Sequence, residues 1–143
     1  MMNKVVIDAS VFGTWLLNET SGFEYAQSLM HKFEINKISL VVPALFFDEV
    51  LNILLKSLSS QRISEKEFEY LTKQLNKFHG LVSQIPYQNS LHDLEQKILL
   101  CRKFSLRSYD SNYLFLSIEN KFHLATLDQR LIRAAKVLGC YYE

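Results

Sequence analysis

The chain has 143 residues, 48% of them hydrophobic and 22% charged, so it can bury a full hydrophobic core and is not a disordered protein. A net charge of +1 excludes a strongly basic or acidic protein, and any nucleic-acid-binding surface has to be local. Four glycines and two prolines leave little of the chain for loops, which predicts a predominance of helices.

The chain is expected to form one cytoplasmic domain over residues 1–143. Cys101 and Cys140 do not form a CxxC pair, and we expect reduced thiols rather than a disulfide or a zinc site. The sequence opens on an apolar strand pattern without the features of a signal peptide. The longest apolar stretches, such as Leu40–Phe47, are too short to span a membrane.

Five strands are predicted, each short, apolar and without regular polar alternation, which is typical of strands buried on both faces. They are Lys4–Asp8, Ile38–Val42, Leu81–Ile85, His123–Thr126 and Gly139–Tyr142. Helical patterns separate them, and this alternation predicts an α/β fold with a parallel sheet covered on both faces.

The helical patterns carry recognisable start signals. Ser64 and Glu67 have the spacing of a capping box, and Pro43 suits the first turn of a helix. The predicted helices lie within 10–33 with a break near Ser21–Gly22, and at Pro43–Ser57, Ser64–His79, Ser90–Phe104, Tyr109–Glu119 and Gln129–Leu138.

Four acidic residues, distant in sequence, are predicted to face one edge of the sheet. Ligands of open parallel sheets bind at the carboxyl ends of the strands, and each acid follows a strand or lies near the start of a helix. The four are Asp8, Glu49, Asp110 and Asp128. Ser10 and Thr126 add hydroxyl groups beside two of them.

Each acid taken singly also has an ordinary structural explanation. Asp8 and Asp128 are placed to cap helices, and Asp110 in a first helical turn suits the helix dipole. Glu49 is harder to explain in this way, because it lies among apolar residues of a helix that we expect to be largely buried. Asp48 is offset from it by about 100°, so we expect Asp48 to face solvent or to form a salt bridge rather than to point at the site.

Taken together, the four acids favour a metal site. Clustered carboxylates raise one another's pKa, and a hard divalent cation such as Mg²⁺ removes that conflict. The histidines are scattered and the sequence contains no GxGxxG or Walker motif, so neither a histidine site nor a nucleotide cofactor is expected. Such a site suits metal-assisted attack of water on a phosphodiester, with the Ser10 hydroxyl hydrogen-bonded to Asp8 or to metal-bound water rather than acting as a nucleophile.

Four segments in order resemble the motifs of the PIN domain family, and within it the VapC-like toxins of toxin–antitoxin pairs. They are VVIDASVFGTWLLNE, VVPALFFDEVLNIL, LRSYDSNYLFLS and LATLDQRLIRAAKVLG, and they span almost the whole chain. The resemblance assigns catalytic and metal-binding roles to Asp8, Glu49, Asp110 and Asp128, with Ser10, Asn52 and Thr126 as supporting polar positions. One departure is Ser111, where alanine is commoner in the family.

The resemblance implies a three-layer α/β/α sandwich with a mostly parallel, five-stranded sheet. It also implies a ribonuclease that depends on Mg²⁺ or Mn²⁺, forms a homodimer and is held inactive by a cognate antitoxin. Arg107, Arg130 and Arg133 are candidate RNA contacts, whereas Arg102 and Lys103 are equally well explained as solvated residues near a helix end.

Two further questions stay open on the sequence alone. Trp15, Tyr25, Phe46 and Phe47 are candidates for an interaction surface, although aromatic residues at such spacings are more often core. The nearly neutral charge leaves an alternative function, a PIN-like domain that binds RNA or protein without cutting or that serves in RNA processing. A phosphatase or receiver-like domain using Asp8 fits poorly, because no aspartate stands two residues after it.

Overall fold

A computed structural model of the chain describes residues 2–86 and 89–143. At its centre is a sheet whose strands are ordered β3-β2-β1-β4 and pair in parallel throughout. The strands are β1 (Asn3–Ile7), β2 (Ile38–Pro43), β3 (Ser83–Ile85) and β4 (His123–Ala125).

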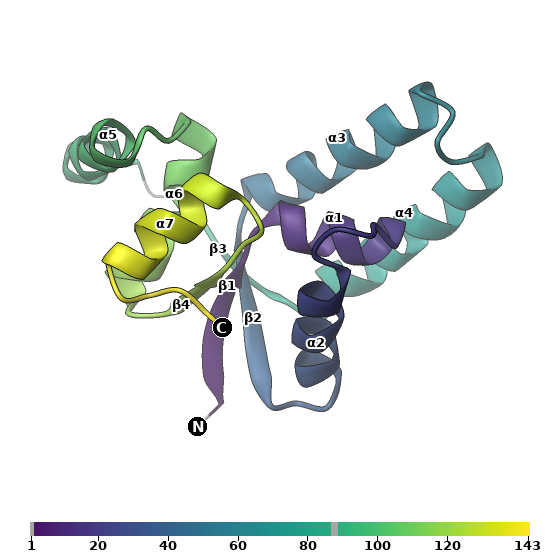
Figure 1. The fold of residues 1–143 in the computed structure, drawn as a ribbon, viewed down its shortest axis with the longest axis horizontal. Helices are drawn as coiled ribbons and strands as arrows, with labels where there is room; N and C mark the ends of the chain where they lie inside the picture. Colours follow the sequence, from purple (N-terminus) through teal and green to yellow (C-terminus); the bar gives the residue numbers. More distant parts are fainter. Residues whose placement is uncertain (1, 87–88) are drawn as a thin grey trace.

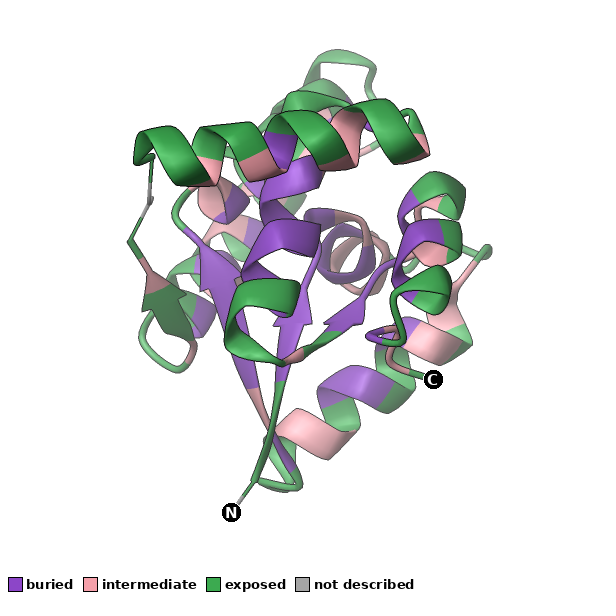
Figure 2. Cartoon of the chain, turned by 90° about the vertical axis from the view of Figure 1, so that its left-hand side faces the viewer, coloured by how far each residue is buried: buried purple, intermediate pink, exposed green. Residues whose placement is uncertain are grey.

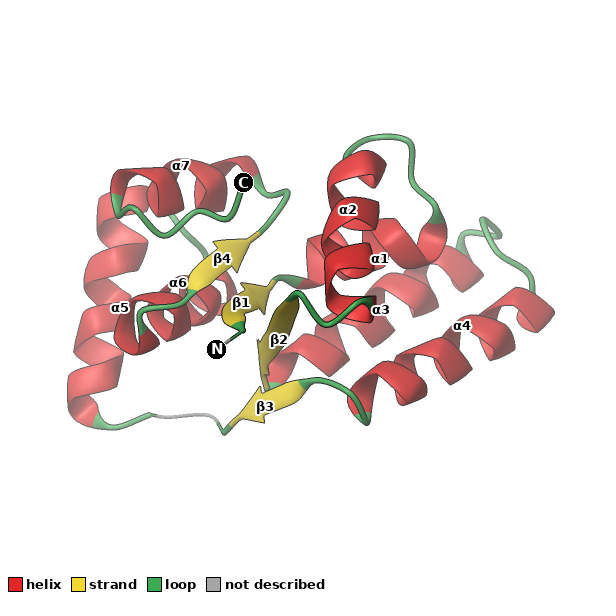
Figure 3. Ribbon diagram, turned by 90° about the horizontal axis from the view of Figure 1, so that it is seen from below, coloured by secondary structure: helices red, strands yellow, loops and turns green. Residues whose placement is uncertain are grey.

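Helices cover both faces of the sheet, which gives three layers (Figure 1). The first layer contains α1 (Ala9–Leu17), α2 (Phe23–Glu34), α3 (Leu45–Ser59) and α4 (Glu65–His79). The second contains α5 (Leu91–Phe104), α6 (Ser108–Asn120) and α7 (Gln129–Val137). Figure 3 shows the two layers on opposite sides of the strands. Helices and a parallel sheet in this arrangement confirm the predicted α/β class.

The two central strands are buried on both faces, as their unbroken apolar sequences predict (Figure 2). Val5, Val6 and Ile7 of β1 are fully buried, and Val5 pairs with Leu40 of β2. On its other side β1 pairs with β4, with Val6 opposite Leu124. The short central strand therefore forms a rigid base whose end point is well defined.

The prediction of five strands is wrong, since the described residues form a sheet of four. The fifth predicted strand, Gly139–Tyr142, makes only an isolated bridge between Tyr141 and Leu124. Gly139 adopts a φ of 71° where the chain leaves α7. Two backbone hydrogen bonds flank Tyr141, and the segment does not pair with β4 beyond them. Leu81 and Val82 are also not strand residues, because their N–H groups donate to Phe78 O and terminate α4.

The predicted helices are confirmed, with small shifts at their ends. Ser64 forms the predicted capping box with Glu67, and Ser90 forms another. The break between α1 and α2 occurs at Gly22, whose φ of 80° favours glycine. Pro43 does not begin α3 but ends β2, and the helix begins at Leu45.

Aromatic residues lie mainly in the core rather than on an interaction surface. The rings of Phe12, Phe46 and Phe78 pack together, with centroids 4.3 to 5.7 Å apart, and join α1, α3 and α4. Trp15, Tyr25 and Phe47 are partly buried against the same core. Both cysteines are free thiols, as predicted. Within residues 2–86 and 89–143, no helix has the length and apolar character needed to cross a membrane.

Candidate functional site

The strand order creates a switch point beside the first strand. The chain leaves β1 towards β2 on one side, and only later returns to place β4 on the other side. Connections therefore diverge from the carboxyl ends of β1 and β4, which is where open α/β sheets bind ligands. Asp8 directly follows β1, and its N–H donates to Ala125 O at 3.0 Å, so its backbone is held between the two strands.

The Asp8 carboxylate is held by two hydroxyl groups. Ser10 Oγ and Thr126 Oγ1 both donate to Asp8 Oδ2 at 2.8 Å. The same hydroxyl oxygens accept backbone N–H groups, Ser10 Oγ from Leu127 at 3.2 Å and Thr126 Oγ1 from Asp128 at 3.1 Å. The start of α1 and the loop between β4 and α7 thus jointly orient the carboxylate. Asp8 stands at the N-cap of α1 but makes no side-chain capping bond.

Burial makes Asp8 a poor acid. Its side chain is only 5% exposed, and desolvation raises its pKa from 3.8 to about 6. The hydrogen bonds from Ser10 and Thr126 lower the pKa but do not offset the burial, and the charge of Asp110 raises it further. Keeping Asp8 ionised at this buried position therefore costs electrostatic free energy. A residue that only caps a helix does not have to be buried in this way.

Glu49 is fixed by a tyrosine that the sequence patterns did not single out. The Tyr113 hydroxyl donates to Glu49 Oε1 at 2.8 Å, linking α6 to α3. Burial, followed by the charges of Asp8 and Asp110, raises the pKa of Glu49 to about 7. Tyr113 is fully buried within the apolar run of α6, where its sequence context indicates only a core residue. Asp48 is exposed as predicted, although it lies on the rim of the same cleft.

Asp110 and Asp128 complete the set of acids. Asp110 lies in the first turn of α6, and burial and the charge of Asp128 raise its pKa. Arg107 and Arg130 act in the opposite direction on that pKa, so both cations lie within electrostatic reach of the site. Asp128 is the N-cap of α7, and its Oδ1 accepts the N–H groups of Arg130 and Leu131 at 3.0 Å.

All four predicted acids line one cleft of about 500 Å³. Asn52 and Lys56 of α3 and Tyr109 of α6 also line it, and Lys56 was not among the predicted residues. Of the predicted arginines, Arg107 and Arg130 are close enough to lower the pKa of Asp110. Arg133 is exposed on α7 and does not line the cleft. Ser111, which stands where alanine was the commoner residue in the motif, is buried and donates to Ser108 O. Its hydroxyl group is therefore satisfied within α6.

The donor set fits a hard divalent cation. Carboxylate and hydroxyl oxygens are the ligands that Mg²⁺ and Mn²⁺ prefer, and the charge of at least one neighbouring acid raises the pKa of each of Asp8, Glu49 and Asp110. In the described part of the chain, no three His, Cys, Asp or Glu side chains are drawn together tightly enough to hold an ion as they stand. Three of the carboxylates accept hydrogen bonds from neutral donors: Asp8 from two hydroxyl groups, Glu49 from Tyr113, and Asp128 from the first turn of α7.

Replacing Tyr113 with phenylalanine is expected to lower the free energy of unfolding by about 1 kcal/mol, because the Glu49 carboxyl loses its donor. Urea denaturation at pH 7 measures the change. Tyr70→Phe is the matched control, since Tyr70 is 62% exposed on α4. Equal stability of the two variants would show that the hydrogen bond between α6 and α3 contributes nothing.

Comparison with known proteins gives a family and a fold. A model of the PIN domain matches residues 5–137. The crystal structure of PAE2754 from Pyrobaculum aerophilum is similar, with a TM-score of 0.70 and 16% sequence identity over 94% of this chain and 81% of that chain. A comparison with curated proteins gives no match.

Proposed function

The chain belongs to the PIN domain family, whose members are generally nucleases, and from this premise we propose that it is a metal-dependent endoribonuclease. The proposal rests above all on one observation. Four carboxylates from four separate segments line one cleft at the switch point of the sheet. Capping alone does not require this convergence, because helix caps stabilise their helices wherever those helices lie.

Asp8, Glu49, Asp110 and Asp128 would hold the ion. The chemistry that a bound Mg²⁺ or Mn²⁺ supplies is neutralisation of phosphate charge and acidification of a water molecule. Ser10 and Thr126 orient Asp8, and Tyr113 orients Glu49, so the side chains are positioned before the substrate arrives. Arg107 and Arg130 lie on the side of Asp110 and supply positive charge for the RNA backbone.

The test is hydrolysis of end-labelled RNA by the purified chain. We expect cleavage with Mg²⁺ or Mn²⁺, none in the presence of a chelator, and recovery when metal is added in excess. Cleavage that persists undiminished in the chelator would contradict the proposal. RNA binding without cleavage at any metal concentration would instead favour the alternative function, a binding module. Two observations support that alternative: the net charge of +1 is nearly neutral, and the described residues contain no compact set of metal ligands.

Within this family we further propose that the chain is the toxin of a toxin–antitoxin pair. The support is the match of the four motifs, in order, to the VapC-like pattern. On this proposal the chain forms a homodimer and is held inactive by a cognate antitoxin. The decisive observation is the neighbouring reading frame: a small upstream gene encoding a DNA-binding segment supports the pair, and an isolated gene favours a role in RNA processing.

A further inference from the structure

The cleft that holds the acids adjoins a second, larger cleft along α3. This second cleft has a volume of about 1040 Å³ and lies beside the turn that joins α3 to α4. Asn52 and Lys56 line both clefts, so the two are neighbours that share one wall. Figure 1 shows α3 and α4 running side by side away from the sheet to this turn. A path therefore leads from the acids along α3.

Side chains on one face of α3 follow this path. Glu49, Asn52 and Lys56 are separated by three and four residues, which places them on the same side of the helix. Seven residues of helix span ~10 Å, a distance that corresponds to ~3 stacked nucleotides at ~3.4 Å each. Lys56 thus stands within a few nucleotides of the acids.

Lys56 is suited to hold a phosphate. It is exposed at the junction of the two clefts, and within residues 2–86 and 89–143 its ammonium group makes no hydrogen bond or ion pair. Two other charged residues of the larger cleft are already engaged, Arg62 with Glu19 and Glu67 with the N-cap of α4. Arg107 and Arg130 lie on the α6 and α7 side of the acids, and Lys56 lies on the α3 side. An RNA strand that crosses the acids therefore meets positive charge on both sides of them.

We propose that the substrate is a single-stranded RNA whose backbone leaves the acids along α3, with one phosphate bound by Lys56. This inference rests on the proposed nuclease function and adds the direction of the bound strand and the residue that holds it. A flexible single strand fits a path that follows one helix for about 10 Å and then enters a second cleft. Asn52 lies between the acids and Lys56, where its amide can donate to the same strand.

The test measures binding rather than cleavage. The Asp8→Asn variant serves as the parent protein, so that hydrolysis does not interfere, and fluorescence anisotropy gives its affinity for a labelled single-stranded RNA over a range of salt concentrations. Adding Lys56→Gln is expected to lower the salt-dependence slope by about 0.7 and the affinity about fivefold at 0.1 M salt. Lys56→Arg, which retains the charge, is expected to bind as the parent does.

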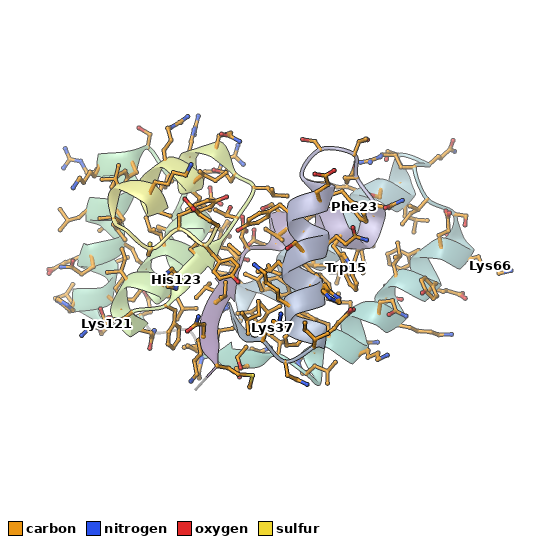
Figure 4. The ribbon with its side chains drawn as sticks, turned by 60° about the horizontal axis from the view of Figure 1, so that its bottom comes forward. Trp15, Phe23, Lys37, Lys66, Lys121 and His123 are labelled. Atoms are coloured by element: carbon orange, nitrogen blue, oxygen red, sulfur yellow. The ribbon has the colours of Figure 1, made fainter. Side chains whose placement is uncertain are left out.

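Lys37→Gln is the matched control. Lys37 is exposed in the turn before β2 (Figure 4). This turn lies at the start of a parallel strand, whereas Asp8 follows the end of β1, so the loss of Lys37 should leave the affinity unchanged. RNAs shortened stepwise from each end locate the contact, because the effect of Lys56→Gln should vanish only when one particular end is removed.

The outcomes separate this inference from the proposed function. If Lys56→Gln and Lys37→Gln bind RNA equally well while the wild type still cleaves it, the path along α3 is wrong and the nuclease function stands. The same result is expected if this groove receives a protein partner instead of RNA. If the parent binds no RNA and the wild type cleaves none, both proposals fail together.

Discussion

Replacing Asp8 with asparagine is expected to abolish RNA cleavage, with kcat/KM falling by at least about a hundredfold. Mutation of a residue that only hydrogen-bonds to a metal ligand already lowers metal affinity or activity roughly 10- to 100-fold, and Asp8 is proposed as a ligand itself. The substitution keeps the size of the side chain and an oxygen able to accept from Ser10 and Thr126, so the hydrogen bonds at 2.8 Å can persist. What it removes is the negative charge.

Single-turnover cleavage of labelled RNA at saturating Mn²⁺ measures this effect. Glu69→Gln is the matched control, because Glu69 is an exposed acid of α4 outside the cleft. Circular dichroism spectra of both variants establish that they are folded. Cleavage by Asp8→Asn at the rate of Glu69→Gln would leave the catalytic role of the acid cleft without support.

Protein freed of metal by a chelator is expected to lose stability as the pH rises from 4 to 7. Burial raises the pKa of Asp8 from 3.8 to about 6, so in this interval the folded state binds more protons than the unfolded state. Stability therefore falls with rising pH, and the full cost of ionising Asp8 reaches about 3 kcal/mol above pH 6. The raised pKa of Glu49, about 7, extends the fall towards neutral pH.

Urea denaturation at several pH values isolates the contribution of Asp8 when wild type and Asp8→Asn are compared. The difference between their free energies of unfolding should change by about 2 kcal/mol between pH 4 and pH 7, with the variant gaining relative to the wild type. Parallel pH profiles for the two proteins would mean that Asp8 titrates normally and is not desolvated as the structure indicates.

The parts of the site that follow from local sequence were predicted well. Strand β1 ends at Ile7, immediately before Asp8, because a run of β-branched residues fills a buried strand. Ser10 donates to Asp8, two residues before it, and Thr126 accepts the N–H of Asp128, two residues after it, so both hydroxyl groups stand beside the acids to which their spacing assigned them. The capping box at Ser64 is likewise a short-range signal. In each case the relevant partners lie within a few residues or at the end of a strongly patterned strand.

Interactions between distant segments account for what was missed. Tyr113 and Glu49 are 64 residues apart, and a buried tyrosine in an apolar helix carries no sign of its hydrogen-bond partner. Lys56 looks like a solvated residue near a helix end until the neighbouring clefts are seen. The error over Gly139–Tyr142 has the same origin, since apolar residues predict burial but not how many of them will find a strand to pair with.

The hydrogen bonds around Asp8 also bear on when the site takes shape during synthesis of the chain. Ser10 and Asp8 leave the ribosome well before their partners Leu127 and Thr126, which lie 117 and 118 positions later. Contacts of such long range form late, because a large loop has to close first. A nascent chain that has not yet released β4 and the loop after it cannot hold Asp8 in place, so the Asp8 carboxylate becomes fixed only after the segment that carries Thr126 and Leu127 has been synthesised.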